Sequence, residues 1–275
     1  METNDKHQVL VIKYGGNAML DDAITSGILD KVAEFSKAGY RVVIVHGGGP
    51  FIEDNLKMAG IESEFVGGHR KTTEEAMKYI EMALKGHVNS KLVRMINQKG
   101  LKAVGLSGKD GNMVRVSRRY HVDEQGRQVD IGYVGDIESM DVSLLNLLLD
   151  QEYVPVVSTI AAGPEGNDYN VNADMFAGHL AGALHANRFV MLTDVDGLMR
   201  DIDDPDSLIR ALSIADIDKL SGSVIRGGMI PKTQACQIAI EEGAGSAIIT
   251  NGTKPDDLRK SILNPQQARA TVFTK

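Results

Sequence analysis

The segment Val42-Val43-Ile44-Val45-His46-Gly47-Gly48-Gly49-Pro50 joins a short apolar run to a glycine turn. Its first four residues are β-branched and apolar on both faces, which is typical of a central strand that helices cover on both sides. Phe51, Ile52 and Leu56 then follow at helical spacing. The segment therefore predicts a strand, a tight glycine turn and a helix, which together form the repeating unit of an α/β fold.

The same order of apolar run, glycines and helical stripe recurs along the whole chain. Further strands are predicted at residues 9–12, 103–106, 154–157, 189–192 and 247–249, and helices at residues 24–35, 77–84, 173–184 and 232–242. Thr72 and Glu75 match a capping box before the second of these helices. Alternating strands and helices predict an α/β fold, a three-layer αβα sandwich with a mostly parallel central sheet. We expect one domain over residues 1–275, with an N-terminal lobe at 1–170 and a C-terminal lobe at 171–275.

One stretch departs from this rhythm. Val114 and Val116, and later Val129 and Ile131, alternate with polar residues. Such alternation is typical of strands that are exposed on one face, and Gly126 between the two runs supplies a turn. We expect an antiparallel hairpin that forms a flap over the mouth of the N-terminal lobe.

The composition is that of an ordinary globular chain of 275 residues, with 43% hydrophobic and 24% charged residues. The formal net charge of −7 repels phosphate backbones, so we expect no nucleic-acid partner. The single cysteine, Cys236, excludes an internal disulfide and lies in an apolar helical run, where we expect it to be buried. No apolar run approaches the ~20 residues that a membrane span needs, and the polar first residues do not resemble a signal peptide. These features favour a cytoplasmic protein without a membrane partner.

Common nucleotide-binding and hydrolase motifs are missing. No G-x-x-x-x-G-K-[ST] or G-x-G-x-x-G sequence follows a predicted strand, which argues against a P-loop enzyme and a dinucleotide dehydrogenase. There is no G-x-S-x-G elbow, and the seven histidines show no metal-ligand spacing. Two glycine clusters remain, at residues 15–16 and 47–49, each at the carboxyl end of a predicted strand. Glycines there let backbone amides approach an anion, and Lys13 beside the first cluster favours a phosphate ligand.

Six motifs resemble those of the amino-acid kinase family and occur in that family's order between residues 9 and 252. They are Ile12-Lys13-Tyr14-Gly15-Gly16-Asn17-Ala18-Met19, Val45-His46-Gly47-Gly48-Gly49-Pro50, Gly105-Leu106-Ser107-Gly108-Lys109-Asp110-Gly111, Asn170-Val171-Asn172-Ala173-Asp174, Leu192-Thr193-Asp194-Val195-Asp196-Gly197 and Gly227-Gly228-Met229-Ile230-Pro231-Lys232. Each motif alone is a weak signal, but six in order over nearly the whole chain make a chance match very improbable. The first two are most similar to the branch of the family that phosphorylates N-acetyl-L-glutamate.

The resemblance implies a phosphotransferase. Such an enzyme moves the γ-phosphoryl group of ATP, bound with Mg²⁺, to the side-chain carboxylate of N-acetyl-L-glutamate in arginine biosynthesis. A carboxylate is already deprotonated at neutral pH, so its phosphorylation needs no general base. The reaction depends instead on positioning, and on cations and amides around the transferred group. Lysines, glycine turns and an orienting carboxylate are all present in the six motifs.

The resemblance also implies roles for particular residues. Lys13 is expected to bind the transferred phosphoryl group from the acceptor side and Lys232 from the nucleotide side, while Asp174 orients both ammonium groups. Amides of the glycine turns, the arginine fork that suits a carboxylate and an asparagine are expected to bind the acceptor, at Gly16, Gly48, Gly49, Arg70 and Asn170. The ATP pocket is expected to be lined by Asp194, Val195, Asp196, Gly197, Leu198, Met199, Val224, Ile225 and Arg226. No protein ligand to the metal is assigned.

The segment after Arg70 departs from the family's usual Arg-Val-Thr-Asp pattern, because Lys71 and Thr73 replace the valine and the aspartate. This leaves N-succinylglutamate, an N-acylated aminoadipate and a carrier-linked glutamate open as acceptors, although Gly49 and Asn172 favour the acetylglutamate branch. Kinases of UMP, carbamate or aspartate match the first two motifs less well. A non-catalytic amino-acid sensor on the same scaffold is a further alternative, against which the presence of both lysines argues.

Both ends of the chain bear on its expected assembly. In the arginine-inhibited members of the resembling family, a helix before the first strand links dimers into a hexamer. In those members a histidine, an acidic residue and a glycine-rich turn near the C-terminus hold arginine. Here residues 1–8 lack helical apolar spacing, residues 255–258 carry no histidine and residues 266–271 carry no glycine. The resemblance therefore implies a homodimer that arginine does not inhibit. The apolar stripe that includes Met77 and Ile80 belongs either to the dimer surface or to the core.

Overall fold

The central feature of the fold is an eight-stranded sheet, seen in a computed structural model that describes residues 7–164 and 166–275. Its strand order is β12-β14-β13-β11-β1-β2-β8-β5. The strands are β1 (Val9–Tyr14), β2 (Arg41–His46), β5 (Lys102–Ser107), β8 (Tyr153–Ser158), β11 (Arg188–Thr193), β12 (Ala211–Ser213), β13 (Ala247–Asn251) and β14 (Ala270–Thr274). All neighbours run parallel except β13 and β14, which are antiparallel. The predicted α/β class with a mostly parallel sheet is confirmed.

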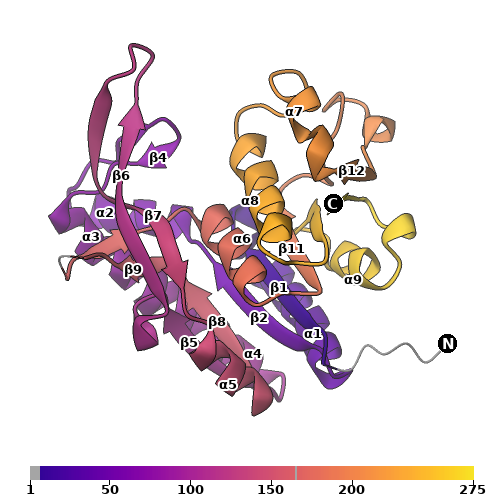
Figure 1. Ribbon diagram of the computed structural model, residues 1–275. Coiled ribbons are helices and arrows are strands. Elements are labelled where there is room, and N and C mark those ends of the chain that lie inside the picture. Colours follow the sequence, from indigo (N-terminus) through magenta and orange to yellow (C-terminus); the bar gives the residue numbers. More distant parts are fainter. Residues whose placement is uncertain (1–6, 165) are drawn as a thin grey trace.

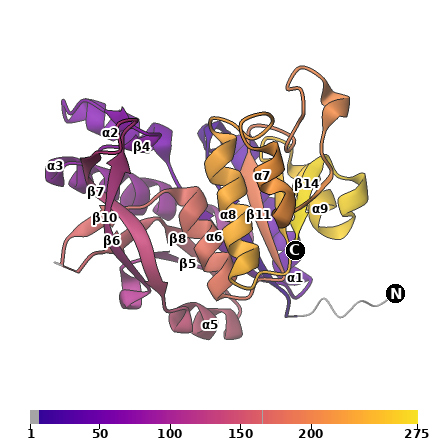
Figure 2. The ribbon, with the colours of Figure 1, turned by 45° about the horizontal axis from the view of Figure 1, so that its top comes forward.

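Helices cover both faces of this sheet (Figures 1 and 2). One face packs against α5 (Ser143–Asp150), α6 (Ala173–Ala183) and α8 (Met229–Glu241), and the other against α1 (Asp22–Lys37), α4 (Ser90–Gln98) and α9 (Pro255–Leu263). The alternation along β1 explains the two cores: Val11 points into the first, whereas Leu10 and Ile12 point into the second. Cys236 of α8 is fully buried in the first core, as predicted. Among the described residues, no helix has the length and apolar character to cross a bilayer.

The predicted hairpin is confirmed and is longer than expected. It consists of β6 (Val114–Val122) and β7 (Gln128–Met140), which pair antiparallel around a turn in which Gly126 has a φ of +75°. With β9 (Ile160–Ala162) and β10 (Asp168–Asn170) it closes a small separate barrel. Figure 1 shows the hairpin rising away from the central sheet.

A second helical layer flanks the N-terminal part of the sheet. It contains α2 (Gly49–Met58), α3 (Glu74–Glu81) and a π-helical segment, η2 (Met82–Asn89), which runs directly into α4. The stripe formed by Met77, Ile80 and Leu84 packs on Ile52 and Leu56 of α2 inside the chain. This stripe is therefore core, and it does not supply a surface for a second copy.

The prediction that Thr72 caps the helix is wrong by one residue. Thr73 is the N-cap of α3, and its hydroxyl accepts a hydrogen bond from the amide of Ala76 at 3.1 Å. Thr72 is buried, and its backbone pairs with β7 at Ile131 and Tyr133 instead. A local sequence pattern does not distinguish two adjacent threonines, whereas the tertiary pairing with β7 does. The short strands β3 (Phe65–Val66) and β4 (His69–Arg70) lead into this segment. Residues 1–6, on which part of the expectation about a leading helix rests, lie outside the described residues.

Candidate active site

Two lysines converge on one carboxylate at the carboxyl end of the sheet. Lys13 lies on β1, Asp174 in the first turn of α6 and Lys232 in the first turn of α8. Nζ of Lys13 lies 2.8 Å from Oδ1 of Asp174, and Nζ of Lys232 lies 2.9 Å from its Oδ2. The structure thus brings together all three residues that were expected to act on the transferred group.

The position of Asp174 follows from how α6 begins. Asn172 caps this helix, and its Oδ1 accepts hydrogen bonds from the amides of Asp174 at 2.9 Å and Met175 at 3.1 Å. Farther along the helix, a Cβ on Gly178 would lie 2.5 Å from the carbonyl oxygen of Ala235. Only glycine allows α6 and α8 to approach this closely, and this approach carries the first turns of both helices to one place.

Asp174 is charged in this setting. Burial of the carboxyl opposes ionisation, but the ammonium groups of Lys13 and Lys232 outweigh it and lower the pKa of Asp174 to about 2. Lys13 contributes mainly as a charge, because its approach to Oδ1 is an ion pair with poor hydrogen-bond geometry. Two cations held by one anion leave a net positive charge, which would stabilise the negative charge on a phosphoryl group during its transfer.

The two glycine turns frame this triad. A Cβ on Gly15 would lie 3.0 Å from Nζ of Lys13, so the lysine side chain folds back closely against the turn at this residue. Gly16 has a φ of +78°, and a Cβ there would lie 3.1 Å from Oδ1 of Asp194. At the second turn, a Cβ on Gly48 would lie 2.9 Å from Leu84. Both turns are thus closely packed at Gly15 and Gly48, which are buried, while Gly16 and Gly49 are exposed.

A cavity of about 200 Å³ opens beside the second glycine turn. Its lining combines backbone of the turn with polar and apolar side chains: Gly47, Gly48, Gly49, Ile52, Phe65, Gly68, His69, Arg70, Leu84, Val134, Thr159, Asn170, Val171, Asn172 and Ala173. Four of the residues predicted to bind the acceptor, Gly48, Gly49, Arg70 and Asn170, are among them. Gly16 is not in this lining and lies instead beside Asp194. The cavity thus gathers residues that the sequence places far apart.

Arg70 is held in place before any ligand arrives. Its side chain is only 9% exposed, pairs with Glu53 at 2.7 Å and stacks on Phe65, with 4.6 Å between the guanidinium carbon and the ring centroid. The same pairing lowers the pKa of Glu53. Lys71, which departs from the family pattern, points to Glu64 at the surface. The other departure, at residue 73, serves as the helix cap described above, so neither departure lines the cavity.

The residues predicted to line the ATP pocket form two loops, at 194–199 after β11 and at 224–226 before α8. Asp196 accepts hydrogen bonds from Asn251 at 2.8 Å, Lys254 at 2.7 Å and Arg269 at 2.6 Å. Although burial opposes ionisation, these donors lower the pKa of Asp196 to about 2. The carboxylate therefore ties the first loop to the ends of neighbouring strands.

The side chains of these two loops differ in what they can contact. Those of Leu198 and Ile225 are buried in the core, so only the backbone is available to a ligand at these positions. Asp194 and Arg226 are exposed. A nucleotide beside these loops would therefore meet polar side chains at the surface and main chain beneath them.

Comparison with known proteins agrees with this arrangement. The profile of the amino acid kinase family matches residues 8–251. The chain belongs to the amino acid kinase family. Among its relatives, acetylglutamate kinase of Methanococcus aeolicus is 39% identical over 98% of this chain and 92% of its own. Acetylglutamate kinase of Heliobacterium modesticaldum is 43% identical over 93% of this chain and 88% of its own.

Solved structures share the fold of this amino acid kinase at lower identity. The smu.665 protein of Streptococcus mutans UA159 superimposes with a TM-score of 0.78 at 24% identity, covering 97% of this chain and 98% of the other. Carbamate kinase of Giardia lamblia bound to AMP-PNP gives a TM-score of 0.68 at 18% identity, covering 97% and 99%. At these identities the likeness establishes the fold.

Sequence reasoning missed two contributors to the site of this amino acid kinase. Asn172 was used only to separate branches of the family, yet it both caps α6 and lines the cavity. Its position directly before a predicted helix is a recognised N-cap signal and could have identified it. Glu53, which holds Arg70, lies on an exposed helix face, where no sequence pattern distinguishes it from a solvated charge.

Proposed function

We propose that this chain is an acetylglutamate kinase, which transfers the γ-phosphoryl group of ATP to the side-chain carboxylate of N-acetyl-L-glutamate in arginine biosynthesis. The observation that carries the proposal is Asp174 between Lys13 and Lys232, beside a cavity that contains Arg70. Relatives of that name, 39% and 43% identical over nearly the whole chain, support it. Because ATP is supplied inside the cell, we place the reaction in the cytoplasm.

The chemistry requires little beyond positioning and charge. An oxygen of the substrate carboxylate forms a bond to the γ-phosphorus while the bond from that phosphorus to the β,γ-bridging oxygen breaks, which gives an acyl phosphate and ADP. No proton has to be removed from the nucleophile. Lys13 lies on the acceptor side and Lys232 on the nucleotide side of the moving group, and both offset its charge in the transition state. Asp174 keeps the two cations in place.

Mg²⁺ is expected to arrive with the nucleotide. Among the described residues, no three His, Cys, Asp or Glu side chains form a metal-binding group. A Mg²⁺ ion usually takes most of its oxygen ligands from phosphates and water, so it does not need a cluster of protein carboxylates. When bound, the ion offsets the negative charge of the phosphates, while the two lysines act on the transferred group.

The acceptor is proposed to lie in the 200 Å³ cavity. Arg70 presents a guanidinium fork to the α-carboxylate, while Gly49 and Asn170 contact the acylated amide. Gly48 directs its amide to the reacting end. We further propose that the acceptor binds mainly to the lobe at residues 1–170, with residues 171–173 completing the cavity. The nucleotide is proposed to bind to residues 171–275, at the loops around Asp196.

We also propose that two copies associate as a homodimer. The support is kinship with the amino acid kinase family rather than a surface seen in one chain. Because the stripe at Met77 and Ile80 is buried, the interface is expected among exposed side chains, of which Met82 and Leu147 are large and apolar.

One assay separates the proposed reaction from its alternatives. Purified protein with ATP and Mg²⁺ is offered N-acetyl-glutamate, N-succinyl-glutamate, N-acetyl-aminoadipate, aspartate and UMP, and acyl phosphate is trapped as its hydroxamate, while UMP turnover is followed by ADP release. We expect the highest kcat/KM with N-acetyl-glutamate. A preference for another acceptor would contradict the acyl or amino-acid assignment. No turnover with any acceptor would favour the sensor alternative.

A further inference from the structure

The histidine at the end of β2, His46, is fully buried and uses both of its ring nitrogens. Nδ1 lies 2.9 Å from the carbonyl oxygen of Gly47, the first residue of the second glycine turn. Nε2 lies 2.9 Å from Nδ2 of Asn89, the last residue of the π-helical segment η2. The imidazole therefore connects a side chain of η2 to the backbone of the turn that lines the acceptor cavity.

The orientation of the Asn89 amide follows from its other neighbours. Nδ2 lies 2.9 Å from the carbonyl oxygen of Val156 and 3.4 Å from that of Leu106. Carbonyl oxygens only accept hydrogen bonds, so the NH₂ group has to face them. Oδ1 faces Gly105, where a Cβ would lie only 2.0 Å away. The amide is buried, and a flipped amide would place its Oδ1 against the carbonyl oxygens of Val156 and Leu106, where no hydrogen bond can form.

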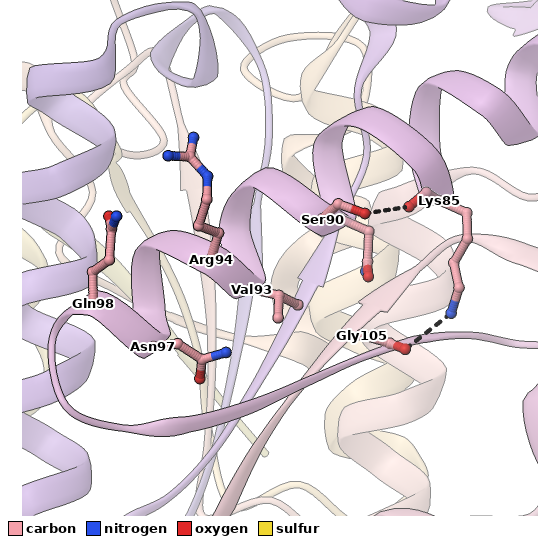
Figure 3. Close-up of a pocket in the computed structure, with 8 residues that line it drawn as sticks. Lys85, Ser90, Val93, Arg94, Asn97, Gln98 and Gly105 are labelled. Atoms are coloured by element: carbon pink, nitrogen blue, oxygen red, sulfur yellow. Dashed lines mark hydrogen bonds between the residues drawn. The ribbon is translucent and has the colours of Figure 1, made fainter.

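Lys85 keeps this arrangement closed. Its Nζ donates to the carbonyl oxygen of Gly105 at 3.0 Å and to Asp110 at 2.9 Å, which clamps β5 against η2. Figure 3 shows Lys85 reaching from η2 to Gly105 of β5 at one end of a pocket that is lined by η2, α4 and Gly105. Gly105 is thereby held against Oδ1 of Asn89.

The tautomer of His46 is then determined. Asn89 donates to Nε2, so Nε2 carries the lone pair and the proton of the neutral ring is on Nδ1. Burial lowers the pKa of His46 to about 4, with the charge of Lys85 acting in the same direction, so the ring stays neutral at physiological pH. Nδ1–H consequently donates to the carbonyl oxygen of Gly47.

This contact sets the direction of a neighbouring amide. The peptide unit between Gly47 and Gly48 is planar and trans, so its C=O and N–H point in opposite directions. Holding the oxygen on the side of the imidazole aims the N–H of Gly48 to the other side. Leu84 and Val88 of η2 pack against Gly48 at the same time, since a Cβ there would lie 2.9 and 3.2 Å from them. A π-helical turn, which is often found at functional sites, therefore supports the glycine turn in two ways.

We propose that Asn89 and His46 are positioning residues for phosphoryl transfer, with Asn89 selecting the Nδ1–H tautomer that aims the Gly48 amide at the reacting groups. The role of the Gly48 amide rests on the proposed function above, whereas the tautomer does not.

Two substitutions of His46 separate hydrogen bonding from packing. The side-chain nitrogen of asparagine can replace Nδ1, whereas that of glutamine occupies the region of Nε2. His46→Gln fills more of the buried space but loses the donor to Gly47. We expect it to lower kcat about a hundred-fold, the order of magnitude for removing one donor to a transition-state charge. We expect His46→Asn to keep a kcat at least ten times higher than His46→Gln, with KM for ATP nearly the same in both. Equal kcat values, or a higher kcat for His46→Gln, would overturn the proposal.

A measurement on the unsubstituted protein needs no substrate. Nitrogen-15 NMR of histidine-labelled protein reports the tautomer, and the His46 signals are identified by their absence in His46→Asn. We expect a neutral ring with the proton on Nδ1 from pH 6 to 8. A proton on Nε2 would refute the tautomer even if the enzyme phosphorylates its acceptor as proposed, and the expected tautomer in an inactive protein would instead refute the function.

Asn89→Asp tests the other end of the connection. The carboxylate cannot donate to His46, so we expect kcat to fall at least ten-fold. The matched control is Asn97→Asp on α4, which continues from η2. Among the described residues, the side chain of Asn97 is hydrogen-bonded only through Oδ1, which accepts from the amide of Ala103 at 2.7 Å and is retained in aspartate. Control activity should stay within two-fold. Equal losses in both variants would show that a new charge, rather than the Asn89 donor, is responsible.

Discussion

Nζ of Lys232 lies 2.9 Å from Oδ2 of Asp174, although 58 residues separate the two in the sequence. The contact crosses from α8 to α6 at the first turns of both helices, one turn before the close approach of Gly178 to Ala235. Lys13 approaches the other carboxylate oxygen from β1. Each element that brings a charge to the site thus also contributes to the core that surrounds it.

Lys13→Ala and Lys232→Ala are each expected to lower kcat far more than they change either KM. The reason is that both cations act on charge that moves in the transition state. By analogy with the loss of one oxyanion donor, each substitution should raise the activation free energy by roughly 2.7–4 kcal/mol, which lowers kcat about a hundred- to a thousand-fold. Steady-state kinetics would measure the fall in kcat. The control is Lys37→Ala, because Lys37 is an exposed lysine at the end of α1. A near-normal kcat in either variant would remove that lysine from the mechanism.

Arg70→Lys is expected to raise KM for the amino-acid substrate by roughly ten- to a hundred-fold, since a hydrogen bond to a charged group contributes about 1.5–3 kcal/mol. An ammonium group cannot reproduce the guanidinium fork. KM for ATP should change little. The control is Arg127→Lys near the tip of the hairpin, where the side chain is 74% exposed. Equal changes in both KM values would show that Arg70 does not bind the substrate carboxylate.

Asp174→Asn is expected to make the stability of the protein less dependent on acid pH. The folded pKa of Asp174, about 2, lies below its ordinary value of 3.8, so the carboxylate contributes stability above pH 4 that is lost as the pH falls towards 2. The difference corresponds to roughly 2 kcal/mol. Thermal unfolding of both proteins between pH 3 and pH 7 should show the largest gap in free energy of unfolding at pH 5 to 7 and a closing gap below pH 4. A constant gap would contradict the shifted pKa.

Asp196→Asn is expected to loosen the loop at residues 194–199, because an amide cannot accept from three donors as a carboxylate does. We expect a loss of about 1–3 kcal/mol in the free energy of unfolding and a rise in KM for ATP without a matching rise for the acceptor. Urea unfolding and initial rates measure both, with Asp54→Asn on an exposed position of α2 as control. A selective rise in KM for the acceptor would place the nucleotide elsewhere.

Arginine is expected not to inhibit the enzyme, and the mass in solution is expected to be that of a homodimer. The helix α9 carries Asp256 and Asp257 but no histidine, and residues 266–271 contain no glycine. Light scattering and an arginine titration of the initial rate would check both points. A hexameric mass together with inhibition at sub-millimolar arginine would contradict the expectation.

Some local features were hidden from the sequence because they depend on distant partners. The adjacent threonines at 72 and 73 look equally suited to cap a helix, and pairing of the first with β7 decides between them. The strand β14 was not predicted, since it enters the sheet antiparallel next to β13 through contacts rather than through a glycine turn. The π-helical segment η2 likewise has no sequence signature, and its last residue, Asn89, donates to carbonyl oxygens of β5 and β8.

By itself, the sequence determined the α/β class, the alternation of strands and helices and the hairpin. These follow from periodicity and from glycines after apolar runs, which act over a few residues. The expectation that Lys13, Asp174 and Lys232 act together came from the resemblance of their motifs to the amino-acid kinase family. Only the tertiary structure decided which side chains meet: the pairing of Lys232 with Asp174, the clamp on Arg70 and the link from Asn89 through His46 to Gly47. The first and the last of these join distant segments, and they depend on two glycines: Gly178, where the backbone of α8 approaches α6, and Gly105, where the side chain of Asn89 approaches β5. A linear pattern does not encode these approaches.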